Sequence, residues 1–126
     1  MEPGLAEAID LNASEDDLRA IRACVDEGDA AREWRQWEIC DRAFHWRLVA
    51  ATHNKLVVAV YATIMKVRHQ SPWLARKRES TNSAKWQIFQ AEHREIADAL
   101  QRRDTRAATK AIAKHLSHVR YGMLEH

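Results

Sequence analysis

The sequence contains few of the residues that turns, disulfide frameworks and membrane spans require. Its 126 residues include three glycines, two prolines and two cysteines, and 46% are hydrophobic. Such a composition favours a compact helical protein over a disordered one. No run of 18 apolar residues and no signal peptide is found, which argues against a transmembrane or secreted protein. Cys24 and Cys40 match no metal or redox spacing, so we expect reduced, half-buried thiols in a cytoplasmic protein.

Neither sign of charge dominates the chain. The sequence has 20 basic and 18 acidic residues, a formal net charge of +2, and the charges are spread along its length. The run Arg76-Lys77-Arg78 is the only basic cluster. A surface that binds DNA concentrates Lys and Arg on one face. We therefore do not expect this chain itself to contact DNA.

Hydrophobic residues recur at helical spacing throughout, and no segment alternates as a strand would. The pattern predicts helices over residues 3–12, 15–27, 29–52, 55–69, 83–102 and 105–123, with Ser14 and Asp104 as N-caps. Gly28 is predicted to end the second helix, and Asn54 to be a left-handed break before the fourth. Residues 73–82 are predicted to form a loop with a helical turn or two. The sequence thus predicts an all-α fold, an antiparallel bundle of about six to seven helices.

Four side chains that can bind metal lie in the apolar stripes of three predicted helices. Asp41 and His45 are four residues apart and share one face of the third helix. His93 and His115 stand at core positions of the fifth and sixth helices. Three imidazoles and a carboxylate suit Zn, Ni, Mn or Fe. A buried Asp–His hydrogen-bond network without metal is the alternative, although a buried carboxylate does need a partner.

The segment DRAFHWRLVAATHN, residues 41–54, closely resembles the D-x-x-F-H-x-x-[LI]-x-x-A-x-x-N signature of a known family. This family is the FadR-type C-terminal domain (FCD) of GntR-family transcription regulators. The opening EPGLAEAIDLNASEDDLRAI and the closing EHREIADALQRRDTRAATKAIAKHLSHV are also similar to it, so the resemblance covers about residues 3–121. It implies one divalent transition metal ion per chain, with Zn or Ni as the first candidates. The implied ligands are Asp41, His45, His93 and His115.

The resemblance also implies a cavity above the metal for a small organic acid. Asn54 matches the family's Asn and is a candidate effector contact, with a helix-end cap as its alternative role. Arg68, on the predicted fourth helix, could reach inward to the acid or could face solvent. His118 lacks the Leu that follows His115, so we do not expect it to bind the metal.

Three functions are compatible with these residues. The leading hypothesis is the effector-sensing and dimerisation domain of a transcription regulator that binds DNA through a separate N-terminal winged helix–turn–helix. A metal-dependent hydrolytic enzyme is the second, but no separate general base accompanies the site, so we predict that the chain is not an enzyme. A purely structural helical module is the third.

Two further expectations concern the limits of the domain and its association. We expect residues 1–123 to form the FCD-like domain, without the winged helix–turn–helix, and residues 124–126 (Leu-Glu-His) to be the remnant of an expression tag. We also expect a homodimer and no contact with a membrane. The chain has more tryptophans than one small core needs, and Trp46 is the first candidate for an interface. The chain has five tryptophans: Trp34, Trp37, Trp46, Trp73 and Trp86.

Overall fold

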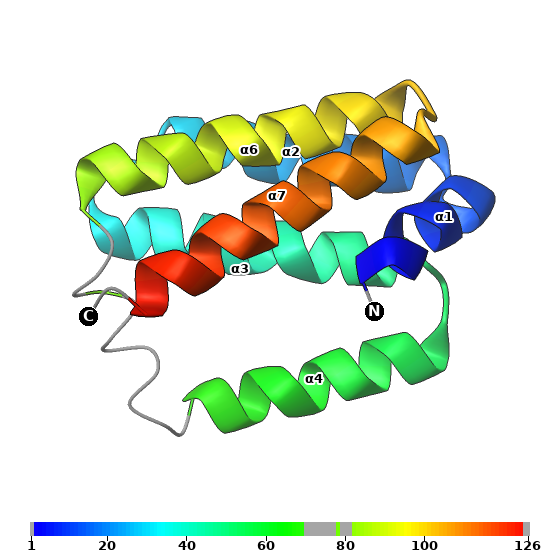
Figure 1. The fold of residues 1–126 in the computed structure, drawn as a ribbon, viewed down its shortest axis with the longest axis horizontal. Helices are drawn as coiled ribbons and strands as arrows, with labels where there is room; N and C mark the ends of the chain where they lie inside the picture. Colours follow the sequence, from blue (N-terminus) through cyan, green and yellow to red (C-terminus); the bar gives the residue numbers. More distant parts are fainter. Residues whose placement is uncertain (1, 70–77, 79–81, 125–126) are drawn as a thin grey trace.

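The predicted all-α fold is confirmed by the computed structural model, which describes residues 2–69, 78 and 82–124 (Figure 1). Within these residues the chain forms six helices and no strand. They are α1 (Glu2–Asn12), α2 (Glu15–Asp29), α3 (Trp34–Ala50), α4 (Lys55–His69), α6 (Ser83–Gln101) and α7 (Thr105–Leu124). None of the described helices is both long and apolar enough to span a membrane.

Five of the helices pack around one hydrophobic core. Helices α6 and α7 run antiparallel side by side, α2 packs against both α3 and α6, and α1 packs against α7 (Figure 1). Leu48, Ile96, Leu100 and Ile112, from α3, α6 and α7, are all less than 4% exposed and meet in this core. The core therefore fixes the relative positions of the three helices that carry the predicted metal ligands.

Side-chain caps explain why several helices begin where the sequence predicts. Ser14 Oγ accepts a hydrogen bond from the Asp17 amide, and Asp17 Oδ2 accepts one from the Ser14 amide, which makes a capping box. Asp104 Oδ1 accepts a hydrogen bond from the Ala107 amide at the start of α7. Each cap satisfies backbone donors that the first helical turn leaves without a partner.

Two predicted helix breaks are wrong in detail. Gly28 does not end α2 through a left-handed conformation, because the helix continues to Asp29 and no described glycine has a positive φ. The left-handed residue before α4 is His53, with φ 51°, and not Asn54. Helix α3 begins at Trp34, five residues later than the predicted start at residue 29. The predicted loop over residues 73–82 lies outside the described residues apart from Arg78 and Asn82.

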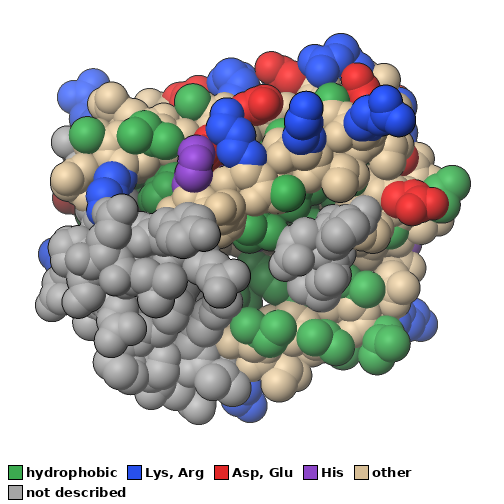
Figure 2. All heavy atoms as spheres, viewed as in Figure 1, with side chains coloured by type: hydrophobic (Ala, Val, Ile, Leu, Met, Phe, Trp, Pro, Cys, Tyr) green, Lys and Arg blue, Asp and Glu red, His purple; other side chains and the backbone are tan. Residues whose placement is uncertain are grey.

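Helix α4 departs most from the predicted packing. Its main neighbour is α3, where the Trp46 ring stacks on Tyr61 with centroids 5.7 Å apart. The stripe predicted to face inward is largely open, since Leu56 is 73% exposed and Val60 43%. Figure 2 shows charged side chains gathered over α6 and α7, and hydrophobic ones along α4 and in the hollow beside it. The apolar face of α4 is therefore not buried by the described part of the chain.

Candidate metal centre

The four predicted metal ligands converge on one point inside the bundle. One ligand atom from each of Asp41, His45, His93 and His115 lies within 4.8 Å of the other three. Asp41 Oδ1 is 3.3 Å from both His45 Nε2 and His93 Nε2, and His93 Nε2 is 3.1 Å from His115 Nε2. The described structure thus assembles a group of potential ligand atoms from residues up to 74 positions apart in sequence, on α3, α6 and α7.

Aromatic rings hold the cluster from its apolar sides. Phe44, fully buried on α3, stacks on the His93 ring with centroids 4.3 Å apart. Phe89 meets the His115 ring edge to face at 5.7 Å. His93 and His115 are each 1% exposed, whereas the His45 side chain is 25% exposed. Access from solvent is therefore on the side of His45.

Burial keeps two of the imidazoles uncharged near neutral pH. It lowers the pKa of His93 from 6.5 to about 4, although the Asp41 carboxylate, 3.3 Å from His93 Nε2, acts in the opposite direction. Burial also lowers the pKa of His115, against the effect of its hydrogen bond with Glu92. A neutral imidazole offers the lone pair that a metal needs. Neutral imidazole nitrogens beside one carboxylate are a donor set that fits a divalent transition metal.

Of the two predicted effector contacts, Asn54 does not join this cluster. Asn54 is exposed, and its Oδ1 accepts hydrogen bonds from the amides of Leu56 and Val57, so it caps α4. The structure thus shows the alternative role considered for this residue. Arg68 lies within α4, but its side chain is outside the described residues. His118 is not among the four converging side chains.

Two buried residues next to the cluster were not singled out from the sequence. Glu92 Oε1 is 2.8 Å from His115 Nδ1, and its other oxygen is bonded to His118 Nδ1. Gln90 Oε1 is 3.3 Å from His93 Nδ1. Burial favours protonation of Glu92, but the hydrogen bonds from the two histidines outweigh it and lower the pKa. Glu92 directly precedes His93, which is the one signal in the sequence that could have drawn attention to it.

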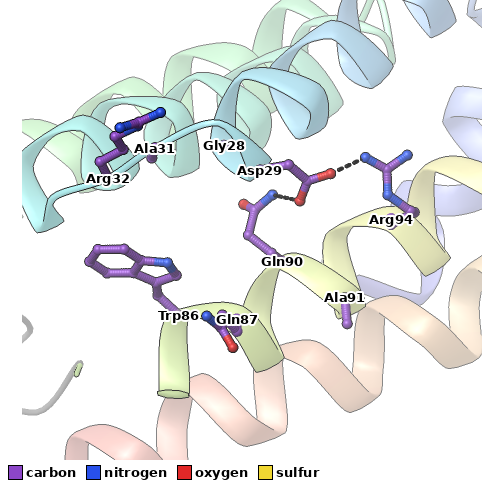
Figure 3. Close-up of a pocket in the computed structure, with 9 residues that line it drawn as sticks. All are labelled: Gly28, Asp29, Ala31, Arg32, Trp86, Gln87, Gln90, Ala91 and Arg94. Carbon is purple, nitrogen blue, oxygen red and sulfur yellow. Dashed lines mark hydrogen bonds and ion pairs between the residues drawn. The ribbon is translucent and has the colours of Figure 1, made fainter. Parts of the chain in front are cut away.

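A surface groove of about 600 Å³ lies between the end of α2 and the first turns of α6 (Figure 3). Trp86, Gln90 and Arg94 contribute to its wall, and none of the four candidate ligands lines it. Asp29 accepts a hydrogen bond from Gln90 and pairs with Arg94 in this wall (Figure 3). The groove is therefore separate from the candidate metal centre, and Gln90 both lines the groove and contacts His93.

The comparisons with known proteins agree with this architecture. Residues 1–118 match the family described as the FCD domain. The chain is also similar to the Uxu operon transcriptional regulator of Escherichia coli (strain K12), with 27% identity over 129 residues. That alignment includes 99% of this chain and 50% of the regulator, so the chain spans about half of that protein's length. The chain therefore belongs to the FCD domain family, the effector-binding domains of GntR-type transcription regulators, and is a regulatory domain, not an enzyme.

Proposed function

We propose that this domain senses a small organic acid through a divalent transition metal, with zinc or nickel as the first candidates. Asp41, His45, His93 and His115 would hold the ion. The observation that carries the proposal is the convergence of their ligand atoms within 4.8 Å in a buried part of the bundle. An Asp/His₃ donor set leaves positions open on a six-coordinate metal, and these suit a carboxylate oxygen.

The sensing domain would act through a DNA-binding domain elsewhere in the regulator. The family and the similar Uxu operon regulator support a role in transcription, and the near-neutral charge of this chain leaves DNA contact to a winged helix–turn–helix. Asn54 and Arg68 stay candidate effector contacts, although Asn54 would have to combine that role with capping α4.

The binding of acid and metal should be coupled. An acid at about 100 times its dissociation constant should raise the free energy of unfolding of the metal-loaded protein by about 2.7 kcal/mol. Chelator-treated protein should gain little, because the acid would bind through the metal. By reciprocity, the acid should also tighten metal binding by the same factor. Thermal and urea unfolding with lactate-, gluconate- and dicarboxylate-like acids, with and without chelator, measures both values. Equal stabilisation of the metal-free protein would show that the acid binds without the metal.

We also propose that the domain forms a homodimer through the exposed apolar face of α4. Leu56, Val60 and Ile64 share this face and are between 38% and 73% exposed, which is typical of a surface that a partner covers. Trp46, the first candidate from sequence, is 42% exposed but already stacks on Tyr61. Trp46 could therefore contact a partner only at the edge of such an interface.

Sedimentation at micromolar concentration should show a dimer. Val60→Glu should weaken the dimer about tenfold or more, because a carboxylate buried without a partner costs several kcal/mol. Leu11→Glu is the matched control, since Leu11 is an exposed apolar residue of α1 and is 77% exposed. A monomer in the wild type, or equal effects of the two substitutions, would remove α4 as the interface.

A further inference from the structure

Glu92 determines which nitrogen of His115 faces the metal centre. Its Oε1 lies 2.8 Å from His115 Nδ1, and both residues are at least 96% buried. The other oxygen of Glu92 meets His118 Nδ1, so both oxygens face ring nitrogens, and a carboxylate accepts hydrogen bonds and does not donate them. His115 Nδ1 therefore carries the hydrogen, and Nε2 is the nitrogen with a free lone pair. That Nε2 is the atom that lies 3.1 Å from His93 Nε2.

Gln90 likewise determines which ring nitrogen of His93 carries the hydrogen. It does so because a hydrogen-bond network fixes the orientation of the Gln90 amide group. Gln90 Nε2 donates to the Val25 carbonyl at 3.0 Å and to Asp29 Oδ1 at 2.9 Å. Because both partners are acceptors, the amide oxygen must point the other way. There it accepts from Trp37 Nε1, which can only donate, at 3.1 Å. It is also 3.3 Å from His93 Nδ1, which must then be the protonated nitrogen.

The two networks together present both imidazoles to the cluster through Nε2. We propose that Gln90 and Glu92 are positioning residues of the metal centre, which hold His93 and His115 in the tautomer and orientation that bind the ion. This inference rests on the proposed metal-binding function. Partners of this kind, on the outer nitrogens of metal-binding histidines, contribute about 10- to 100-fold to metal affinity in other proteins.

Charge gives Glu92 a second role in the same site. A divalent ion beside Asp41 alone would leave a net charge of +1 inside the bundle, and an unbalanced buried charge is unfavourable. Glu92 is 4% exposed and one hydrogen bond away from His115, so its carboxylate brings the assembly to neutrality. Glu92 therefore adds a negative charge in direct contact with the candidate ligand His115.

The test measures zinc affinity by competition with a chromophoric chelator. Glu92→Leu should bind zinc about 10- to 100-fold more weakly than the wild type. Glu92→Gln should fall between the two, because an amide oxygen still accepts from His115 but carries no charge. Glu95→Gln is the matched control, since Glu95 also reaches from α6 to α7, where it pairs with exposed Lys114 at 3.5 Å. It should change the affinity less than twofold.

A spectroscopic measurement separates positioning from a general loss of stability. In cobalt-substituted protein, the ring N–H hydrogens of metal-bound histidines give shifted NMR signals that are visible only while exchange with water is slow. Glu92→Leu should lose the signal of His115 and keep that of His93. Gln90→Leu should do the reverse, and Gln87→Leu, an exposed glutamine on the same helix, should lose neither.

The outcomes distinguish this inference from the metal site itself. If the wild type binds zinc, His93→Ala does not, and Glu92→Leu binds as tightly as Glu95→Gln, the positioning role is wrong and the metal site stands. If the wild type binds no zinc, both are wrong. Should Glu92→Leu fail to fold, Glu92→Gln decides: unchanged zinc affinity together with an unchanged His115 signal would overturn the inference.

Discussion

Zinc at about a thousand times its dissociation constant should raise the free energy of unfolding by about 4 kcal/mol. This is the stabilisation expected for one ion that binds the folded chain and not the unfolded one. The reason is geometric: the four ligand atoms lie within 4.8 Å only when α3, α6 and α7 are packed together. Urea unfolding followed by circular dichroism, with excess zinc and with chelator, measures the difference.

His93→Ala should abolish most of that difference. The variant loses an imidazole at the centre of the cluster, within 3.3 Å of Asp41 and 3.1 Å of His115. It also leaves a cavity beside Phe44, so the zinc-dependent gain, and not the absolute stability, is the quantity to compare.

A matched control removes a histidine from an Asp–His pair elsewhere. His53 contacts Asp17 at 2.6 Å on the surface and has φ 51°, a conformation that asparagine tolerates. His53→Asn should therefore keep the full gain from zinc. A full gain in His93→Ala as well would exclude His93 from the metal ligands.

Trp37→Ala should lower the free energy of unfolding by about 3–5 kcal/mol, measured on metal-free protein by urea unfolding. Trp37 is 0% exposed, and its ring stacks against Trp86 and Phe89 with centroids 6.1 Å away in both cases. Removing it creates a large cavity between α3 and α6. The substitution also removes the donor to Gln90.

Trp46→Ala provides the comparison for the loss of an indole ring from α3. Trp46 is 42% exposed and contacts Tyr61 of α4, so its removal opens no buried cavity. We expect a cost of about 1 kcal/mol. Similar costs for the two substitutions would mean that Trp37 is not a central packing residue.

Local signals in the sequence were sufficient for most of the fold. Ser14 and Asp104 mark the starts of α2 and α7 because their side chains cap the helices, an interaction within four residues. The predicted range of the fourth helix, residues 55–69, is the observed α4. Its burial could not be predicted, because a hydrophobic stripe such as Leu56 and Val60 indicates an apolar face but not what covers it.

The site shows a similar division between local and distant information. The spacing of Asp41 and His45 places them on one helical face, and the apolar stripes of two later helices place His93 and His115 at core positions. The resemblance to the FCD family then implied that the four bind one ion. Gln90 and Glu92 stand three residues and one residue before His93, but these positions alone do not indicate their roles. Their partners Val25 and His115 lie 65 and 23 residues away, so these contacts exist only after the helices have packed.

Because Gln90 lies close to Gly28, the residue that fits at position 28 depends on the side chain at position 90. A Cβ atom at position 28 would come within 2.5 Å of Gln90 Oε1, the same oxygen that faces His93 and Trp37. Glycine thus fits at position 28 because there is no space for a Cβ atom, and not because the backbone needs a positive φ there. A larger residue at 28 requires either that the Gln90 amide moves from this position or that residue 90 is shorter, and in both cases the contact with His93 is lost. A substitution at Gly28, outside the cluster, therefore also alters how firmly a candidate metal ligand is held.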